Sequence, residues 1–267
     1  MVAHWLDLPV VFDFDDAIFL SNTSEPNTYI ERFKRPGKVA TIIGWSQEVI
    51  AGNAFLAHFA RQFNPNVTVI PSAIDTDYYQ PLEEPPRRKE IVIGWIGSHS
   101  TRKFVATLKP AFQVLATRYP DVRFELVGTE HPITEVPRLT ARLWRLDREL
   151  ADVRGFDIGV MPMPDDLWTQ GKCGFKAILY QALGLPLICS PVGVNRDIVH
   201  DGVNGFLADS TEEWVEKLSR LVEDADLRRT LGDKGRQSVE ARYSVRAHQD
   251  NFLAVLERAA RTGRRSR

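Results

Sequence analysis

Two cysteines in 267 residues, Cys173 and Cys189, are too few and too far apart for a disulfide framework or a zinc-binding cluster. No stretch approaches the roughly 20 consecutive apolar residues that a transmembrane helix needs. The first residues also lack the charged-then-apolar order of a signal peptide. Charge of neither sign dominates, and the net charge of −1 gives no reason to expect nucleic acid as a partner. These absences predict a cytoplasmic protein without a structural metal.

What the chain does contain is a set of short apolar runs. Four of them cover residues 91–97, 123–128, 157–163 and 186–192. Each run is too continuous for a half-exposed strand, which indicates burial on both faces. Apolar residues at helical spacing follow, from Val105 to Tyr119 and from Phe175 to Leu183. Strands that alternate with helices predict an α/β fold with a doubly wound parallel sheet.

The remaining patterns suggest a division into domains. Apolar runs at 10–14, 49–52 and 67–74 predict three strands, with Asn53 as a helix cap, and Ser210 and Glu213 form a capping box. We expect a partial N-terminal α/β region over 1–74, a linker rich in proline and charge over 75–89, a main domain over 90–243, and a C-terminal helix with a basic tail over 244–267. The first region is short for an independent domain, so we expect it to pack against its neighbour or against a partner subunit.

Three loops are expected to meet at the carboxyl edge of the main sheet, where open parallel sheets bind ligands. They are GSHSTRK (97–103), GTEH (128–131) and QGKCGF (170–175). Backbone N–H groups at a helix start, together with nearby cations, favour a diphosphate. The residues predicted to bind it are Gly97, Ser98, Arg102, Lys103, Gly128, Lys172, Gly174 and Phe175. Taken one at a time, each loop is equally well read as an ordinary strand-to-helix turn.

The segments 69–81, 93–103 and 157–195 resemble, in collinear order, retaining glycosyltransferases of family four, the glycosyl transferases group 1. The resemblance extends from about Val49 to Leu256. It implies the GT-B fold, in which two Rossmann-like halves flank the active site. It also implies a UDP- or GDP-linked sugar as donor and an unidentified glycan or lipid-linked acceptor. No cofactor or metal is expected, because such enzymes use basic residues and a helix start instead.

The chain departs from the family pattern at two places. The family has two glutamates, separated by seven residues, that contact the donor sugar and the ribose; Cys173 and Gln181 occupy those positions. Gln181 can still hydrogen-bond a ribose hydroxyl, and Cys173 is expected to be an inert thiol. Lys172 and Lys176 match a subgroup of the family, and Lys176, Cys173 and Gln181 join the predicted donor-binding residues. The N-terminal region is about half the usual length, so no catalytic acid or base can be nominated. A non-catalytic or partner-dependent donor-binding fragment is the alternative.

A second resemblance competes at the N-terminus. The segment VVFDFDD is similar to the first motif of haloacid-dehalogenase-like phosphatases, which would make Asp13 the nucleophile and Asp15 the acid–base around Mg²⁺. Position 17 is alanine rather than threonine or valine, and residues 232–237 supply only one acid of the later metal-binding pair. The phosphatase is therefore the minor alternative.

The chain ends in an arginine-rich tail, Arg258–Arg267. We expect this tail to be solvated. Each basic residue adds about 1 kcal/mol of attraction to an anionic membrane, so a weak peripheral contact at the inner face is a further expectation.

Overall fold

The computed structural model describes residues 8–20, 36–83 and 89–265. The chain forms two compact units. Unit 1 comprises Met1–Ala73, Asp166–Cys173 and Val245–Arg267, and unit 2 comprises Ile74–Asp165 and Gly174–Ser244.

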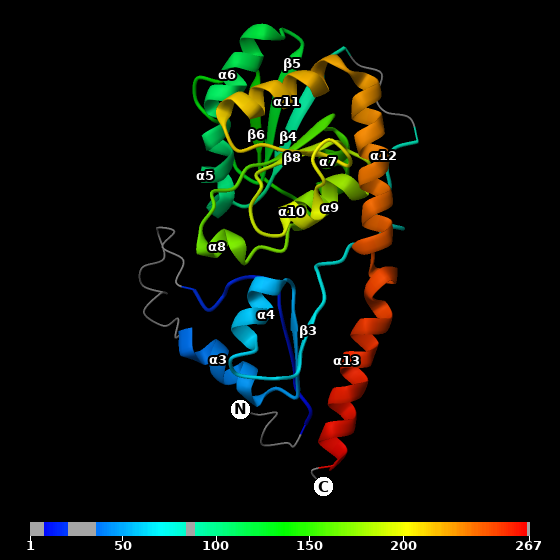
Figure 1. Ribbon diagram of the computed structural model, residues 1–267. Coiled ribbons are helices and arrows are strands. Elements are labelled where there is room, and N and C mark those ends of the chain that lie inside the picture. Colours follow the sequence, from blue (N-terminus) through cyan, green and yellow to red (C-terminus); the bar gives the residue numbers. More distant parts are fainter. Residues whose placement is uncertain (1–7, 21–35, 84–88, 266–267) are drawn as a thin grey trace. The chain divides into compact units, whose positions relative to one another are not determined.

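Unit 2 is built on a six-stranded parallel sheet with the order β6-β5-β4-β7-β8-β9 (Figure 1). The strands are β4 (Ile91–Ile96), β5 (Val122–Val127), β6 (Leu139–Arg142), β7 (Ile158–Met161), β8 (Leu187–Cys189) and β9 (Phe206–Leu207). All neighbouring strands pair in parallel. The four strands predicted from continuous apolar runs are therefore confirmed, and so is the parallel sheet.

The helices of unit 2 lie between these strands or follow the last of them, β9. They are η1 (His99–Thr101), α5 (Arg102–Val105), η2 (Ala106–Leu108), α6 (Lys109–Arg118), α7 (Glu149–Arg154), α9 (Phe175–Ala182), α10 (Asn195–Ile198), α11 (Thr211–Glu223) and α12 (Ala225–Arg242). The predicted cap of α11 is present, because the Ser210 hydroxyl accepts from the Glu213 amide at 3.2 Å. The Glu213 carboxylate accepts from the Asp209 amide, one residue before the cap, so the capping box is only half formed.

Both faces of this sheet are buried. Along β4, Ile93 and Trp95 point into one core, which α6 and α11 cover, whereas Val92 and Ile96 point into a second core with α9 and α12. Successive strand residues face opposite sides, so helices on both faces account for the continuous apolar run. This arrangement is the predicted doubly wound α/β sheet.

Unit 1 contains a smaller parallel sheet with the order β1-β2-β3. Its elements are β1 (Val11–Phe14), β2 (Glu48–Ala51), β3 (Val67–Val69), α3 (Pro36–Trp45), α4 (Ala54–Ala60), α8 (Leu167–Gln170) and α13 (Val245–Arg265). Asn53 caps α4 as predicted, accepting from the Leu56 amide at 2.8 Å. The strand predicted over 67–74 ends at Val69, shortly before Pro71, which has no N–H for a sheet hydrogen bond.

The C-terminal helix belongs to unit 1. In α13, Val255 is completely buried against Ile50 of β2 and Ile70. The Arg258 guanidinium donates to both carboxylate oxygens of Glu48, at 3.1 and 2.9 Å. The prediction treated 244–267 as a separate element, but these contacts make α13 part of the N-terminal unit.

The residues predicted as a linker are also integrated into a unit. Within 75–89, the described residues up to 83 belong to unit 2. The Arg236 guanidinium of α12 donates to the carbonyl oxygen of Thr76 at 2.7 Å and to that of Tyr79. Arg154 of α7 donates to the carbonyl of Gln80. Carbonyls that a free linker would expose to water are thus satisfied by arginines of unit 2.

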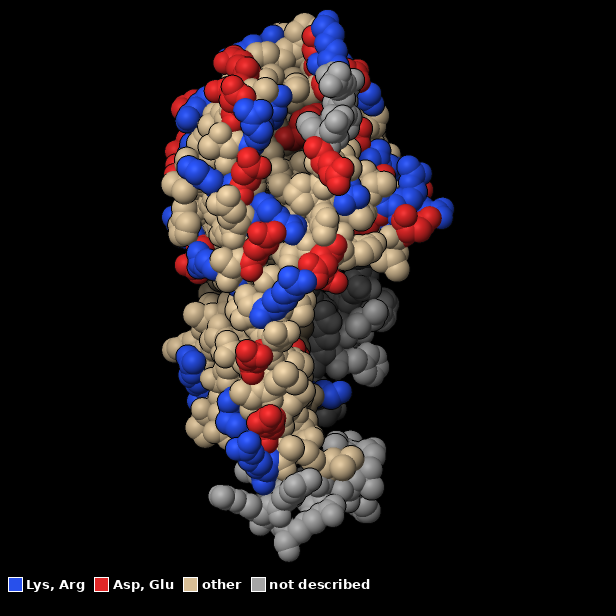
Figure 2. Space-filling model, turned by 90° about the vertical axis from the view of Figure 1, so that its right-hand side faces the viewer, with Lys and Arg blue, Asp and Glu red and all other residues tan. Residues whose placement is uncertain are grey.

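Two surface properties bear on partners. Within the described ranges, none of the helices combines the length and the apolarity needed to cross a bilayer. On the face that Figure 2 shows, Lys and Arg side chains are interspersed with Asp and Glu rather than gathered into one field. That face therefore presents no continuous basic surface of the kind that attracts nucleic acid. Of the predicted basic tail, the side chains from residue 262 onward lie outside the described residues.

Candidate functional site

Two glycines meet at the carboxyl edge of the unit 2 sheet. Gly97 follows β4 and Gly128 follows β5, and Gly128 has a φ of +110°. A Cβ added to Gly128 would lie 1.6 Å from the carbonyl oxygen of Gly97. Only two bare backbones can approach this closely. The structure thus brings together the first two predicted loops.

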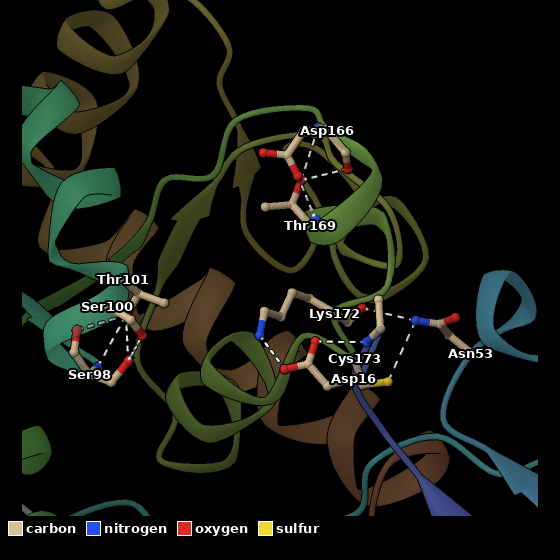
Figure 3. A network of polar contacts seen from close by, with 10 residues as sticks. Asp16, Asn53, Ser98, Ser100, Thr101, Asp166, Thr169, Lys172 and Cys173 are labelled. Atoms are coloured by element: carbon tan, nitrogen blue, oxygen red, sulfur yellow. Dashed lines mark hydrogen bonds and ion pairs between the residues drawn. The ribbon is translucent and has the colours of Figure 1, made fainter. Parts of the chain in front are cut away.

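The loop after Gly97 is held by hydroxyl groups. The Ser98 amide donates to the Thr101 hydroxyl at 3.1 Å, and this hydroxyl donates back to the Ser98 carbonyl at 3.0 Å (Figure 3). Arg102 bridges the two loops, because its Nε and Nη2 donate to the carbonyls of His131 and Pro132 at 2.9 and 3.0 Å. Lys103 is exposed, with its Nζ 5.4 Å from the centre of the Phe104 ring. Arg102 therefore orders the loops, and Lys103 is the more accessible cation.

The third predicted loop leads into α9 through a left-handed glycine. Gly174 has a φ of +70° and precedes the first helical residue, Phe175. An added Cβ would meet Ile198 of α10 at 2.3 Å. Among the described residues no side chain caps α9, and the Ala177 amide donates to the Gly174 carbonyl at 2.9 Å. The positive end of the helix dipole lies at this first turn and favours an anion. Phe175 is exposed and Lys176 half-buried on this first turn.

Gln181 lies deeper than the other predicted donor-binding residues. Its side chain is completely buried and donates to the Asn204 carbonyl at 2.9 Å. Its Oε1 is buried as well and has no hydrogen-bond partner among the described residues. Contact between Gln181 and a ribose hydroxyl stays a prediction, and this Oε1 is the atom that the hydroxyl would have to reach.

Lys172 lies in the segment 166–173, which is part of unit 1. Its Nζ is 2.6 Å from Oδ2 of Asp16 (Figure 3) and 3.7 Å from the centre of the Trp168 ring. Its carbonyl accepts from Nδ2 of Asn53 at 3.1 Å. An ammonium has three donors, so one pair with Asp16 leaves capacity for a second anion. About a quarter of the side chain, 24%, is exposed.

Cys173 fills a space that glycine leaves open. Its Sγ is 2.4 Å from where a Cβ of Gly52 would lie, and it accepts from Nδ2 of Asn53 at 3.6 Å. Burial, assisted by the charge of Asp15, raises the pKa of the Cys173 thiol to about 12. A thiol that stays protonated is a poor nucleophile. The position that carries a glutamate in the family thus holds a packing residue in this chain.

The acidic residues of the rival phosphatase motif follow β1. Asp13 is exposed to solvent, yet neighbouring atoms crowd its carboxyl group, and this partial desolvation together with the charge of Asp15 raises its pKa. Across the described part of the chain, no group of three or more His, Cys, Asp or Glu residues is placed to hold a metal ion. Neither observation supplies the Mg²⁺ site that this alternative needs.

Sequence reasoning missed two residues that hold the Lys172 loop. Asp16 was passed over beside Asp13 and Asp15, and Asn53 was recognised only as a helix cap. Asn53 is 119 positions from Lys172 along the chain. The available signal was the small residues that let the segments approach, since a Cβ on Gly171 would lie 2.5 Å from the Cβ of Ala17.

Comparison with proteins of known sequence finds relatives that include a glycosyltransferase. The chain is 27% identical over 168 residues to the capsular polysaccharide biosynthesis glycosyltransferase CapM of Staphylococcus aureus, covering 57% of this chain and 42% of CapM. It is 28% identical over 278 residues to spore coat protein SA of Bacillus subtilis, covering 91% of this chain and 73% of that protein. The chain thus spans less than half the length of CapM.

Solved structures agree on the fold. HepE from Anabaena, in complex with UDP and glucose, matches with a TM-score of 0.74 at 17% identity, covering 96% of this chain and 73% of HepE. Sucrose-phosphate synthase from Thermosynechococcus elongatus matches with a TM-score of 0.70 at 19% identity, covering 94% of this chain and 68% of the synthase. At such identities the likeness concerns the fold, which is that of GT-B glycosyltransferases.

A family model settles the assignment that these likenesses suggest. The model of the glycosyl transferases group 1 matches residues 90–224, which include the β4 and β5 loops and the start of α9. The match covers half of the chain and begins one residue before β4. The doubly wound sheet, the paired glycines and the helix that starts at Gly174 all lie inside it. The chain belongs to the glycosyl transferases group 1 family.

Proposed function

We propose that this protein transfers a glycosyl group from a nucleoside-diphosphate sugar to a glycan or lipid-linked acceptor. The family assignment supports transfer of a sugar, and the named activity of CapM supports a polysaccharide pathway. HepE, whose fold this chain shares, has been solved with UDP and with UDP-glucose. A UDP-linked sugar is therefore the donor we favour over a GDP-linked one.

The start of α9 is the observation that carries the proposal. The helix begins without a side-chain cap, after a glycine whose left-handed backbone leaves no room for a side chain. The positive end of its dipole suits a phosphate. Lys172 is two residues before Gly174 in the chain, and two residues span at most about 7 Å.

We further propose that transfer proceeds with retention of configuration and without a metal ion. In this mechanism the charge that develops on the leaving diphosphate is stabilised by fixed N–H groups and by Lys172, with Lys103 and Lys176 as further cations. Such preorganised groups stabilise developing charge without reorganising during the reaction. The amides of Gly97, Ser98 and Gly128 donate to Val127, Thr101 and Arg142, so these residues would shape the donor site rather than donate to the diphosphate. Arg102 keeps the loops in place.

Titration calorimetry with UDP, GDP and UDP-glucose tests the donor site. We expect UDP to bind and Gly174→Ala to weaken binding at least about tenfold, because the methyl group displaces the first turn of α9. Gly202→Ala is the matched control: Gly202 has a similar φ of +73° but only Phe206 within 4 Å of an added Cβ, at 3.9 Å. Absence of binding by all three nucleotides to the unmodified protein would contradict the proposal.

Turnover separates the enzyme from its alternative, a donor-binding fragment that depends on a partner. Both bind UDP, but only the enzyme releases UDP from UDP-glucose when an acceptor mixture is added. The alternative has a basis in unit 1, whose described residues form a sheet of three strands against six in unit 2. Nucleotide binding without any turnover over a broad acceptor panel would favour the fragment.

A further inference from the structure

The carboxylate of Asp16 makes two contacts at once. Its Oδ1 accepts from the Ala17 amide at 2.9 Å, and its Oδ2 pairs with the Lys172 ammonium at 2.6 Å (Figure 3). Ala17 is buried against Gly171, where an added Cβ would clash at 2.5 Å. One carboxylate therefore fixes the turn that packs on the loop and the cation that the loop carries.

Further contacts order the rest of the loop 166–173. Trp168 packs against the apolar core of unit 1, and the Lys172 ammonium lies over its ring at 3.7 Å. The Asp166 carboxylate caps α8 through the Thr169 amide at 2.8 Å. The Gly171 and Lys172 amides donate to the carbonyls of Trp168 and Thr169, at 3.2 and 3.1 Å. Internal hydrogen bonds thus fix the shape of the loop 166–173, and Trp168 anchors it to the core of unit 1.

The exposure of this ion pair argues against a role in stability alone. The side chains of Lys172 and Asp16 are 24% and 34% exposed. Pairs that remain in contact with water contribute little to folding. What the pair does provide is order, because a free lysine samples many rotamers and loses that freedom when it binds an anion. A lysine that is already fixed over Trp168 loses less conformational entropy when it binds an anion.

We propose that Asp16 is a positioning residue: it orders the loop 166–173 and holds the Lys172 ammonium in the orientation that receives the donor diphosphate. This inference rests on the proposed function, because it assigns the anion to a nucleoside-diphosphate sugar. Asp16 itself does not touch the donor. Its negative charge would repel a phosphate, so the proposal holds only if ordering of the lysine outweighs that repulsion, and the sign of the Asp16→Asn effect decides this.

Calorimetric titration of UDP into four proteins measures that sign: the wild type, Asp16→Asn, Lys172→Met and the double variant. We expect Asp16→Asn to weaken UDP binding about five- to tenfold, the size of one ordered charge-assisted hydrogen bond. It should have no further effect in the Lys172→Met background, because the carboxylate acts through the lysine. Asp16→Glu should restore part of the affinity. Equal or tighter UDP binding by Asp16→Asn, or additive losses in the double variant, would overturn the proposal.

The chain offers a closely matched control. Asp201 of unit 2 also pairs with a lysine, Lys217, at 3.2 Å, and also accepts from a backbone amide, that of Leu207, at 2.8 Å. Asp201→Asn removes the same two kinds of contact, and neither Asp201 nor Lys217 is among the predicted donor-binding residues. We expect it to leave UDP affinity unchanged. An equal loss in Asp201→Asn would show that the Asp16 effect is one of general stability.

A measurement without nucleotide separates this inference from the proposed function. Hydrogen exchange of the Gly171 and Lys172 amides should become faster in Asp16→Asn than in the wild type, and remain unchanged in Asp201→Asn. If the wild type bound no nucleotide but the exchange rates rose, the proposed function would fail while the ordering role of Asp16 stood. Unchanged exchange in Asp16→Asn would refute that role, whatever the nucleotide does. Asn53 is a poorer test site, because its side chain also caps α4.

Discussion

Both units of this molecule are built on a parallel sheet, but different interactions stabilise each of them. Unit 2 buries both faces of six strands under helices that lie near them in the sequence. Unit 1 assembles three separated stretches of chain around three strands. Polar pairs between distant residues connect those stretches, such as Arg258 with Glu48, 210 positions apart. Apolar periodicity builds unit 2, and specific side-chain pairs complete unit 1.

The close approach of backbones in unit 2 gives the largest expected effect. Gly128→Ala would place a methyl group 1.6 Å from the Gly97 carbonyl oxygen at a φ of +110°. We expect the free energy of unfolding to fall by at least about 3 kcal/mol, because both strands must separate to admit the methyl group. Urea denaturation followed by circular dichroism measures this loss.

Gly37→Ala in α3 of unit 1 is the control for that prediction, since no atom of the described residues lies within 4 Å of an added Cβ there. Alanine also favours a helix, so the free energy of unfolding should stay equal or rise by no more than about 1 kcal/mol. Similar stabilities for the two variants would mean that the strand ends of unit 2 are less tightly joined than the geometry indicates.

A smaller effect is expected from the polar pair that ties α13 to unit 1. Arg258→Met leaves the Glu48 carboxylate, only 7% exposed, without its guanidinium partner. Loss of a partner to a buried charge is costly, but Arg258 is itself 47% exposed, which reduces the effect to about 1–2 kcal/mol. Thermal or urea unfolding of the variant gives the value.

Arg261→Met provides the comparison, because Arg261 pairs with Glu257, and both side chains are well exposed at 78% and 66%. We expect a change within about 0.5 kcal/mol. If the Arg258 and Arg261 variants were equally stable, the Glu48 pair would add nothing specific to unit 1.

The same contrast explains what the sequence could predict. The strand from Ile91 was predictable because burial on both faces requires an unbroken apolar run. β6 was missed because it is an edge strand of polar and half-buried residues, Leu139–Arg142, with no such run. The glycines at 97 and 128 were predicted as site residues from their position after strands. Periodicity thus identifies elements whose burial is repeated along the chain.

The Lys172 loop lay beyond that kind of reasoning. Its sequence position between β7 and α9 suggested unit 2, but its contacts are with Asp16, Ala17 and Asn53 of unit 1. Nothing in the local pattern around 172 indicates a partner more than a hundred positions away. Likewise, Gln181 has the spacing of a ribose ligand, whereas its burial depends on α12 and the turn at Asn204. Contacts between residues that are far apart in the sequence become visible only in the folded structure.

The two cysteines allow the stability of the units to be compared in one experiment, with the smallest expected effect. Cys173 belongs to unit 1 and Cys189 to unit 2, and both are buried. Burial raises the pKa of both thiols, that of Cys173 to about 12. At pH 8.5 the folded protein therefore keeps them protonated, whereas an unfolded thiol, with a pKa of about 8.5, is half ionised and reacts.

Labelling at pH 8.5 therefore requires local opening, and its rate reports the free energy of that opening. We expect Cys173 to react about tenfold faster than Cys189 at low urea, a difference of about 1.4 kcal/mol, because unit 1 has the smaller core. Mass spectrometry of the two peptides measures each rate. Raising the pH above about 8.5 should destabilise the protein, because the unfolded thiols release protons that the folded ones retain. Equal labelling of both thiols at every urea concentration would show that the units unfold together. Polar pairs would then stabilise unit 1 as much as apolar burial stabilises unit 2.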